Sequence, residues 1–136
     1  MQLALRAGAI VLATVGAAEK RTFLTERYGI PAEHIFSSRG KSFAGAVRRV
    51  TKRQGVDVVL NSLGGEGFLT SLECLAPYGR FVELGKKDMQ EQSALPILAL
   101  TKSATFCAVE VSQLTRDRPG VVAEALASAV KLVEEG

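Results

Sequence analysis

Short apolar runs alternate along the chain with longer segments whose apolar residues have helical spacing. The clearest run is "VDVVLNSL" at 56–63, of the kind that is buried on both faces of a parallel sheet. Similar short runs predict strands at 9–14, 34–38, 79–85 and 104–111. Strands that alternate with helices predict an α/β fold built on a doubly wound parallel sheet, Rossmann-like in architecture.

The segments between these runs carry helix start and stop signals. Gly29, with Pro31 just beyond it, marks a helix end, and Ser42 is a candidate N-cap for the helix that follows. The opening segment "MQLALRA" has no cap before it, so we expect it to be the end of a helix that begins earlier. Helices are predicted at 1–7, 17–28, 42–53 and 66–75, and after Pro119 through "VVAEALASAVKLVEE".

Composition places the chain among ordinary globular proteins. It has 136 residues, of which 47% are hydrophobic and 23% charged, so we expect one domain spanning 1–136. The net charge is +3, and the densest basic run, "RRVTKR" at 48–53, is expected to cover the C-terminal end of a helix, where cations suit the helix dipole. Nucleic acid is therefore not an expected partner.

The cysteines and the apolar runs narrow the cellular setting. Cys74 and Cys107 lie far apart in apolar surroundings, which indicates core residues in a reducing compartment and not a disulfide. His34 is the single histidine, so a zinc site lacks ligands. Since no run approaches the roughly 18 apolar residues of a membrane span, we expect a cytoplasmic protein without a membrane partner.

The end of the strand at 9–14 carries the first sign of a ligand. In NAD-binding βαβ units an Asp or Glu at the tip of the second strand binds the ribose hydroxyls. Here that position holds "TVG" (14–16), followed by "EKR" (19–21), and Arg39 follows the next predicted strand. If 9–14 is the second strand, the missing acid and nearby cations suit a 2′-phosphate, and the cofactor is NADPH.

A different assignment makes 56–61 the first strand, with "GGEG" (64–67) as the phosphate loop and Glu83 as the ribose acid. It fails because the third glycine of the motif falls on Thr70. The favoured assignment places the first strand and its glycine loop before Met1. Without that strand, the second and fourth strands have unpaired edges, so we expect the chain alone to bind NADPH weakly at best and to catalyse nothing.

Several blocks together resemble a known family. "TVGAAEKR", "YGIPAEHIFSSR", "GVDVVLNSL", "CLAPYGRFVELGKKD" and "TFCAVEV" occur in the order found in enoyl reductase domains of reducing polyketide synthases, particularly the fungal ones. These domains belong to the zinc-free medium-chain dehydrogenase/reductase superfamily. The resemblance implies an NADPH-dependent reduction of the α,β double bond of an enoyl thioester on an acyl carrier protein. It also implies that the substrate domain and the rest of the synthase lie outside this chain.

The resemblance implies two groups of cofactor-binding residues and a catalytic pair. Each also has a structural alternative: a helix cap, a solvated loop cation or the polar face of an edge strand. Lys86 matches a proposed proton donor or oxyanion stabiliser, and Glu110 stands where its paired acid is normally Asp. The residues matched to the cofactor are Gly16, Lys20 and Arg39 around the adenosine phosphate, Ser37 and Ser38 at the adenosine end, Asn61, Ser62 and Leu63 along the nicotinamide ribose, and Gly85.

Other functions remain open beside the reductase. The chain is alternatively a non-catalytic remnant that contributes an interface, with the strand at 104–111 as a candidate homodimer contact. A quinone-oxidoreductase-like NADPH reductase is a further alternative. A short-chain reductase needs Tyr-x-x-x-Lys, which is absent because Tyr28 is followed by Ala32 and Tyr78 by Val82.

Overall fold

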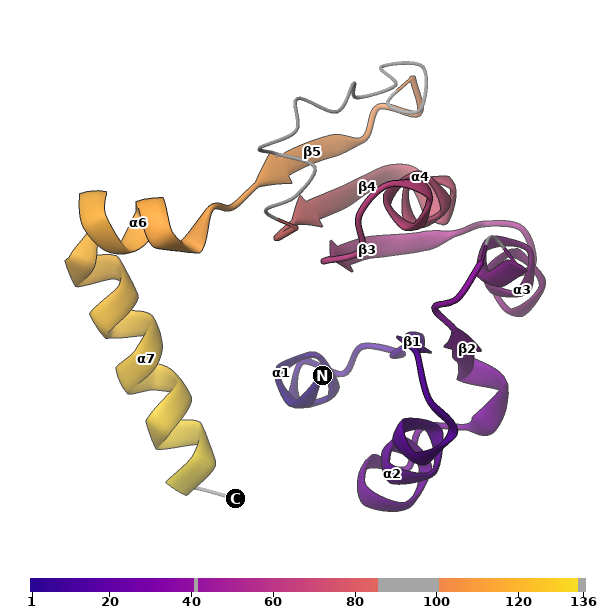
Figure 1. The fold of residues 1–136 in the computed structure, drawn as a ribbon, viewed down its shortest axis with the longest axis horizontal. Helices are drawn as coiled ribbons and strands as arrows, with labels where there is room; N and C mark the ends of the chain where they lie inside the picture. Colours follow the sequence, from indigo (N-terminus) through magenta and orange to yellow (C-terminus); the bar gives the residue numbers. More distant parts are fainter. Residues whose placement is uncertain (41, 86–100, 135–136) are drawn as a thin grey trace.

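The computed structural model describes residues 1–40, 42–85 and 101–134 (Figure 1). Its elements confirm the predicted alternation of strands and helices. In chain order they are α1 (Gln2–Arg6), β1 (Ala13–Val15), α2 (Ala18–Tyr28), the 3₁₀ helix η1 (Ala32–His34), β2 (Ile35–Ser37), α3 (Ser42–Val50), β3 (Val56–Asn61), α4 (Glu66–Glu73), β4 (Leu75–Glu83), β5 (Thr105–Ala108), α6 (Val111–Asp117) and α7 (Pro119–Glu134).

Every strand pairing in the described chain is parallel, which confirms the predicted fold class. β1 pairs with β2, and β3, β4 and β5 form a second sheet in that order. In the described residues no ladder joins β1 to β3, and Figure 1 shows the two groups of strands as separate ribbons. The sheet is therefore interrupted between β1 and β3, which are the second and fourth strands of the favoured assignment, as expected.

Two strand boundaries differ from the sequence prediction. The strand expected at 9–14 is confined to Ala13–Val15, because its partner β2 has only three residues. β4 begins at Leu75 and not near 79, because the Val56 amide donates to the Cys74 carbonyl (2.9 Å). An irregularity in the register between Val56 and Val58 accommodates Pro77, which has no N–H to donate.

The segment after β5 also differs from expectation. The strand predicted at 104–111 is only Thr105–Ala108, and a helix not predicted from the sequence, α6, begins at Val111. Glu110 ends the extended segment because its carboxylate accepts hydrogen bonds from the first turn of that helix. Glu110 is thus a helix cap and not part of an edge strand.

Two apolar clusters hold the sheet and its helices together. In the first, Phe68 of α4 packs on Phe81 of β4, which is fully buried and stacks on Phe106 of β5 at 5.6 Å between ring centres. In the second, Phe43 and Val47 of α3 meet neighbouring elements of both sheets. These clusters contain side chains from β2, α3, α4, β4 and β5, so they pack the strands against the helices.

The last two helices lie apart from the sheets in Figure 1. α7 was predicted and is present, but within the described chain it contacts chiefly α6. Its apolar side chains are correspondingly exposed, Val133 by 76% and Leu126 by 62%. This helix therefore forms as predicted, but none of its residues is buried.

Candidate functional site

The carboxyl ends of β3, β4 and β5 meet at one edge of the larger sheet. Asn61 is in register with Glu83, and Glu83 with Ala108. The ladder continues past the strand ends, since the Leu84 amide donates to the Asn61 carbonyl and the Val109 amide to the Glu83 carbonyl, both at 2.8 Å. In doubly wound sheets this edge is where ligands bind.

A buried acid and a buried amide face each other at this edge. Glu83 is 1% exposed and Asn61 2% exposed. The Asn61 Nδ2 donates both to Glu83 Oε2 (2.7 Å) and to the Leu63 carbonyl (2.8 Å), while the Gly85 amide donates to Glu83 Oε1. Because protein donors engage both Glu83 oxygens, the assignment that made Glu83 a ribose acid loses its key residue.

The tips of β1 and β2 bring together the residues expected at the adenosine end. Val15 is in register with Ser37, and the Ser38 amide donates to the Val15 carbonyl (2.8 Å). A Cβ added to Gly16 would lie 3.5 Å from Ser38 Oγ, so the glycine and the serine hydroxyl are neighbours. The Arg39 amide donates to Ser37 Oγ (3.2 Å), which places this cation directly after the strand tip.

The helix after β1 distinguishes two cations that the sequence alone does not separate. Lys20 is exposed in the first turn of α2, whose N-cap, Ala17, makes no side-chain capping bond. Arg21 instead donates from Nη1 to the Ala32 carbonyl (2.9 Å) and so ties α2 to η1. Lys20 remains a candidate ligand cation, whereas Arg21 has a structural role.

The remaining predicted site residues have different surroundings. Ser62 is exposed after the tip of β3, and Leu63 packs against the α3 cluster. Glu110 accepts from the amides of Ser112 (3.2 Å) and Gln113 (2.5 Å) at the start of α6. Lys86, the other member of the predicted catalytic pair, lies outside the described residues.

Two features of the site were missed from the sequence. The Asn61–Glu83 pair was not predicted, although an amide and an acid at the ends of neighbouring predicted strands are a signal for it. The capping role of Glu110 was also missed, and the acid directly before "VSQLTRD" is its signal.

Two hollows lie at the other end of the strands. One, of about 740 Å³, is lined by Gly45 and the cations of "RRVTKR", and an adjoining one of about 430 Å³ reaches Glu73 and Lys102. Both lie beside the turn from α3 into β3, at the amino ends of the strands. The last turn of α3 contains Arg48 and Arg49, which confirms the expected position of this basic run at a helix end.

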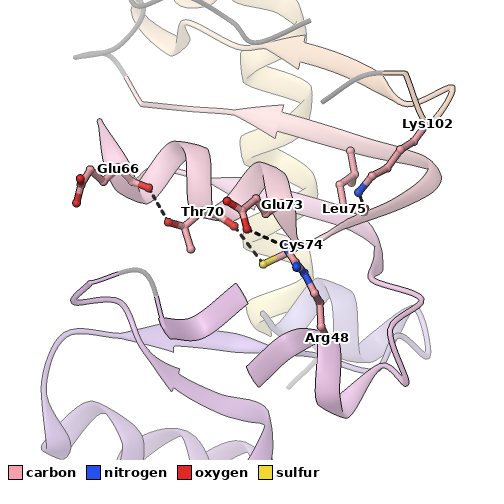
Figure 2. A network of polar contacts seen from close by, with 7 residues as sticks. All are labelled: Arg48, Glu66, Thr70, Glu73, Cys74, Leu75 and Lys102. Atoms are coloured by element: carbon pink, nitrogen blue, oxygen red, sulfur yellow. Dashed lines mark hydrogen bonds and ion pairs between the residues drawn. The ribbon is translucent and has the colours of Figure 1, made fainter. Parts of the chain in front are cut away.

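Figure 2 shows the contacts that join these elements. Arg48 of α3 forms an ion pair with Glu73 of α4 (2.6 Å), and Lys102 donates to the Leu75 carbonyl (3.1 Å). The Cys74 thiol donates to the Thr70 carbonyl (3.3 Å), and burial raises the pKa of Cys74 to about 11. A neutral, buried thiol and an ion pair between helices have structural roles, so these hollows are not the candidate cofactor site.

The described residues contain neither a metal-binding cluster nor a membrane-spanning helix. No group of three or more His, Cys, Asp and Glu side chains in residues 1–40, 42–85 and 101–134 is arranged to hold a metal ion. Within the same ranges, no helix combines the length and the apolar character needed to cross a membrane.

Comparison with known proteins identifies the family of this chain. The family described as "Zinc-binding dehydrogenase" matches residues 1–130. The chain is 44% identical over 136 residues to reducing polyketide synthase rads1 of Floropilus chiversii, and 46% identical over 133 residues to the squalestatin tetraketide synthase of a Phoma species. These alignments cover 100% and 98% of this chain but 6% and 5% of the synthases, so the chain spans a small part of its curated relatives.

Solved structures lead to the same group. The nucleotide-binding subdomain of the enoylreductase domain of PpsC from Mycobacterium tuberculosis superposes with a TM-score of 0.86 at 37% identity, covering 98% of this chain and 73% of that one. The CurK enoyl reductase superposes with a TM-score of 0.81 at 33% identity, covering 99% of this chain and 39% of that one. The chain therefore belongs to the zinc-binding dehydrogenase family, among the nucleotide-binding subdomains of polyketide synthase enoyl reductases.

Proposed function

We propose that this chain binds NADPH as the cofactor-binding part of an enoyl reductase. The reductase reduces the α,β double bond of an enoyl thioester carried on an acyl carrier protein. The observation that supports NADPH most directly is the tip of β1, where Gly16 stands in place of a ribose-binding acid and Ser38 lies beside it. The reduction itself is proposed for the larger protein and not for this chain alone, because the chain spans only 6% of relatives such as rads1.

The residues at the β1–β2 tips fit an anionic group chemically. Ser37 and Ser38 supply hydroxyls, and Lys20 and Arg39 supply exposed cations on either side. The first turn of α2 adds backbone N–H groups without a side-chain cap, and a helix N-terminus favours negative charge. A 2′-phosphate gains charge-assisted hydrogen bonds in these surroundings that a ribose hydroxyl does not.

The larger sheet supplies the other end of the proposed site. Asn61, Ser62, Leu63 and Gly85 stand at the adjoining tips of β3 and β4, where they would lie along the nicotinamide ribose. When bound, NADPH supplies the hydride that the β-carbon of the substrate accepts. Lys86 is the proposed proton donor or oxyanion stabiliser, and Glu110, its proposed partner, holds the start of α6.

A fluorescence titration with NADPH and NADH tests the proposal. We expect NADPH to bind more tightly, and Lys20→Ala to weaken NADPH binding about tenfold while leaving NADH unchanged, as for the loss of one charge-assisted hydrogen bond. Arg27→Ala is the matched control, since it removes the same charge from the last turn of the same helix.

Equal effects of Lys20→Ala and Arg27→Ala would contradict the assignment of the 2′-phosphate to the β1 tip. A folded chain that binds neither cofactor would contradict the proposed function and favour an interface role. That role would be measured as a dimer that dissociates when β5 is altered.

A further inference from the structure

Glu83 is the one charged side chain among the buried residues of the described chain. Burying a carboxylate costs free energy unless donors replace the lost water. The proposed hydride transfer gives this group no chemical task. Its burial at the end of β4 therefore calls for another explanation.

The geometry around Glu83 requires two acceptor oxygens. Oε2 receives the Asn61 Nδ2 at 2.7 Å, and Oε1 receives the backbone amide of Gly85. A carboxylate accepts at both oxygens, whereas a glutamine side chain has an acceptor at one position and an NH₂ donor at the other. A glutamine at this position would therefore turn a donor toward either Asn61 or Gly85.

The second hydrogen on Asn61 Nδ2 is also engaged, because this atom donates to the Leu63 carbonyl at 2.8 Å. The carboxylate thus connects three pieces of backbone. It reaches the end of β3 and the turn after it through the Asn61 amide, and the segment that leaves β4 through the Gly85 N–H. These include the residues proposed to lie along the nicotinamide ribose.

Gly85 fits the same arrangement. A Cβ at this position would lie 2.6 Å from Glu83 Oε1 and 3.7 Å from the Ser62 carbonyl. A glycine therefore allows the backbone to approach the carboxylate, and any other residue displaces it. The closeness of these atoms explains, without reference to any ligand, why a glycine stands two positions after the glutamate in "ELG" (83–85).

We propose that Glu83 is a positioning residue for the cofactor. Its buried carboxylate locks the Asn61 side chain and the Gly85 amide, and so holds the tips of β3 and β4 in the arrangement that receives the nicotinamide ribose. The cofactor part of this inference rests on the proposed function. The fixing of the Asn61 side chain and the Gly85 amide by the Glu83 carboxylate does not. Glu83 acts through its neighbours and contacts neither cofactor nor substrate.

The test uses Glu83→Gln in the 136-residue chain with two readouts. Amide hydrogen exchange measured by NMR without cofactor reports the Gly85 N–H and the Asn61 side-chain NH₂, and fluorescence titration reports NADPH affinity. Loss of a hydrogen bond to a charged group predicts at least about tenfold faster exchange at the group that the glutamine NH₂ faces, the Gly85 N–H or the Asn61 side-chain NH₂, and about tenfold weaker binding. Gly85→Ala, which keeps the charge but displaces the carboxylate, is expected to weaken binding similarly.

The matched control is Thr70→Val, which removes a buried hydrogen bond from α4 (Thr70 Oγ1 to the Glu66 carbonyl, 2.7 Å) with little change of shape. It is expected to lower stability while leaving Gly85 exchange and NADPH affinity unchanged. Should Glu83→Gln fail to fold, Gly85→Ala decides, and unchanged affinity in Gly85→Ala overturns the proposal.

Unchanged exchange at both the Gly85 N–H and the Asn61 side-chain NH₂ in a folded Glu83→Gln variant also overturns it. A wild-type chain that binds no NADPH defeats the proposed function and the cofactor role together. The exchange of these two groups then still decides whether the Glu83 carboxylate holds Asn61 and Gly85 in place.

Discussion

Replacing Glu110 with alanine is expected to loosen the start of α6. The Glu110 carboxylate accepts from the Ser112 amide at 3.2 Å and the Gln113 amide at 2.5 Å. Loss of an N-cap costs about 1 kcal/mol, and loss of a negative charge at a helix N-terminus costs about 0.3–1 kcal/mol more. The expected destabilisation of α6 is therefore about 1–2 kcal/mol.

Because α6 packs chiefly on α7 within the described chain, this loss is expected to appear as local opening. Hydrogen exchange by NMR would then show the Ser112 and Gln113 amides exchanging about 5–30 times faster in Glu110→Ala. Glu110→Asp is expected to keep both amides protected, since aspartate is a good N-cap. Glu124→Ala is the matched control, because it removes the same charge from the middle of α7.

Two results would refute this reasoning. Unchanged exchange at both amides in Glu110→Ala would show that the cap contributes nothing. Equal acceleration in Glu124→Ala would show that net charge, and not capping, controls the segment. In a complete enoyl reductase, a Glu110→Ala variant that keeps α6 intact but loses activity would instead support the predicted catalytic acid.

Three further predictions concern the packing around Cys74. At pH 8, a pKa of about 11 predicts that Cys74 reacts with iodoacetamide about 100-fold more slowly than a thiol of ordinary pKa 9.0. Because this pKa is raised on folding, stability should fall as pH rises from about 9 toward 11, and a flat urea-midpoint profile there would refute it. Gly55→Ala places a Cβ 2.7 Å from the Cys74 carbonyl at φ +84°, whereas Gly40→Ala meets open space at φ +83°; urea unfolding should show Gly55→Ala to be less stable than Gly40→Ala by about 2 kcal/mol or more, and equal midpoints would contradict this.

Local signals in the sequence predicted most of the fold. Gly29 ends α2 in the left-handed conformation at φ 64°, as its position before Pro31 indicated. The apolar run at 56–61 is β3, and the alternation of elements predicted the parallel pairings. These features depend on residues within a few positions of one another, so the order of residues along the chain is enough to determine them.

The closeness of two residues proposed for the adenosine end was predictable for a related reason. Gly16 and Ser38 each follow a predicted strand, and the tips of adjacent parallel strands lie together. The sequence did not separate Lys20 from Arg21, because their different roles depend on the position of the Ala32 carbonyl after the chain has turned.

The pair of Asn61 and Glu83 was decided by tertiary structure. These residues are 22 positions apart, and their contact depends on the register of β3 on β4 and on the burial of both side chains. The early start of β4 likewise depends on its pairing with Val56, which overrides the helix predicted as far as residue 75. A sequence pattern determines which face of an element is apolar, but only packing determines which polar groups that face encloses and which donors they meet.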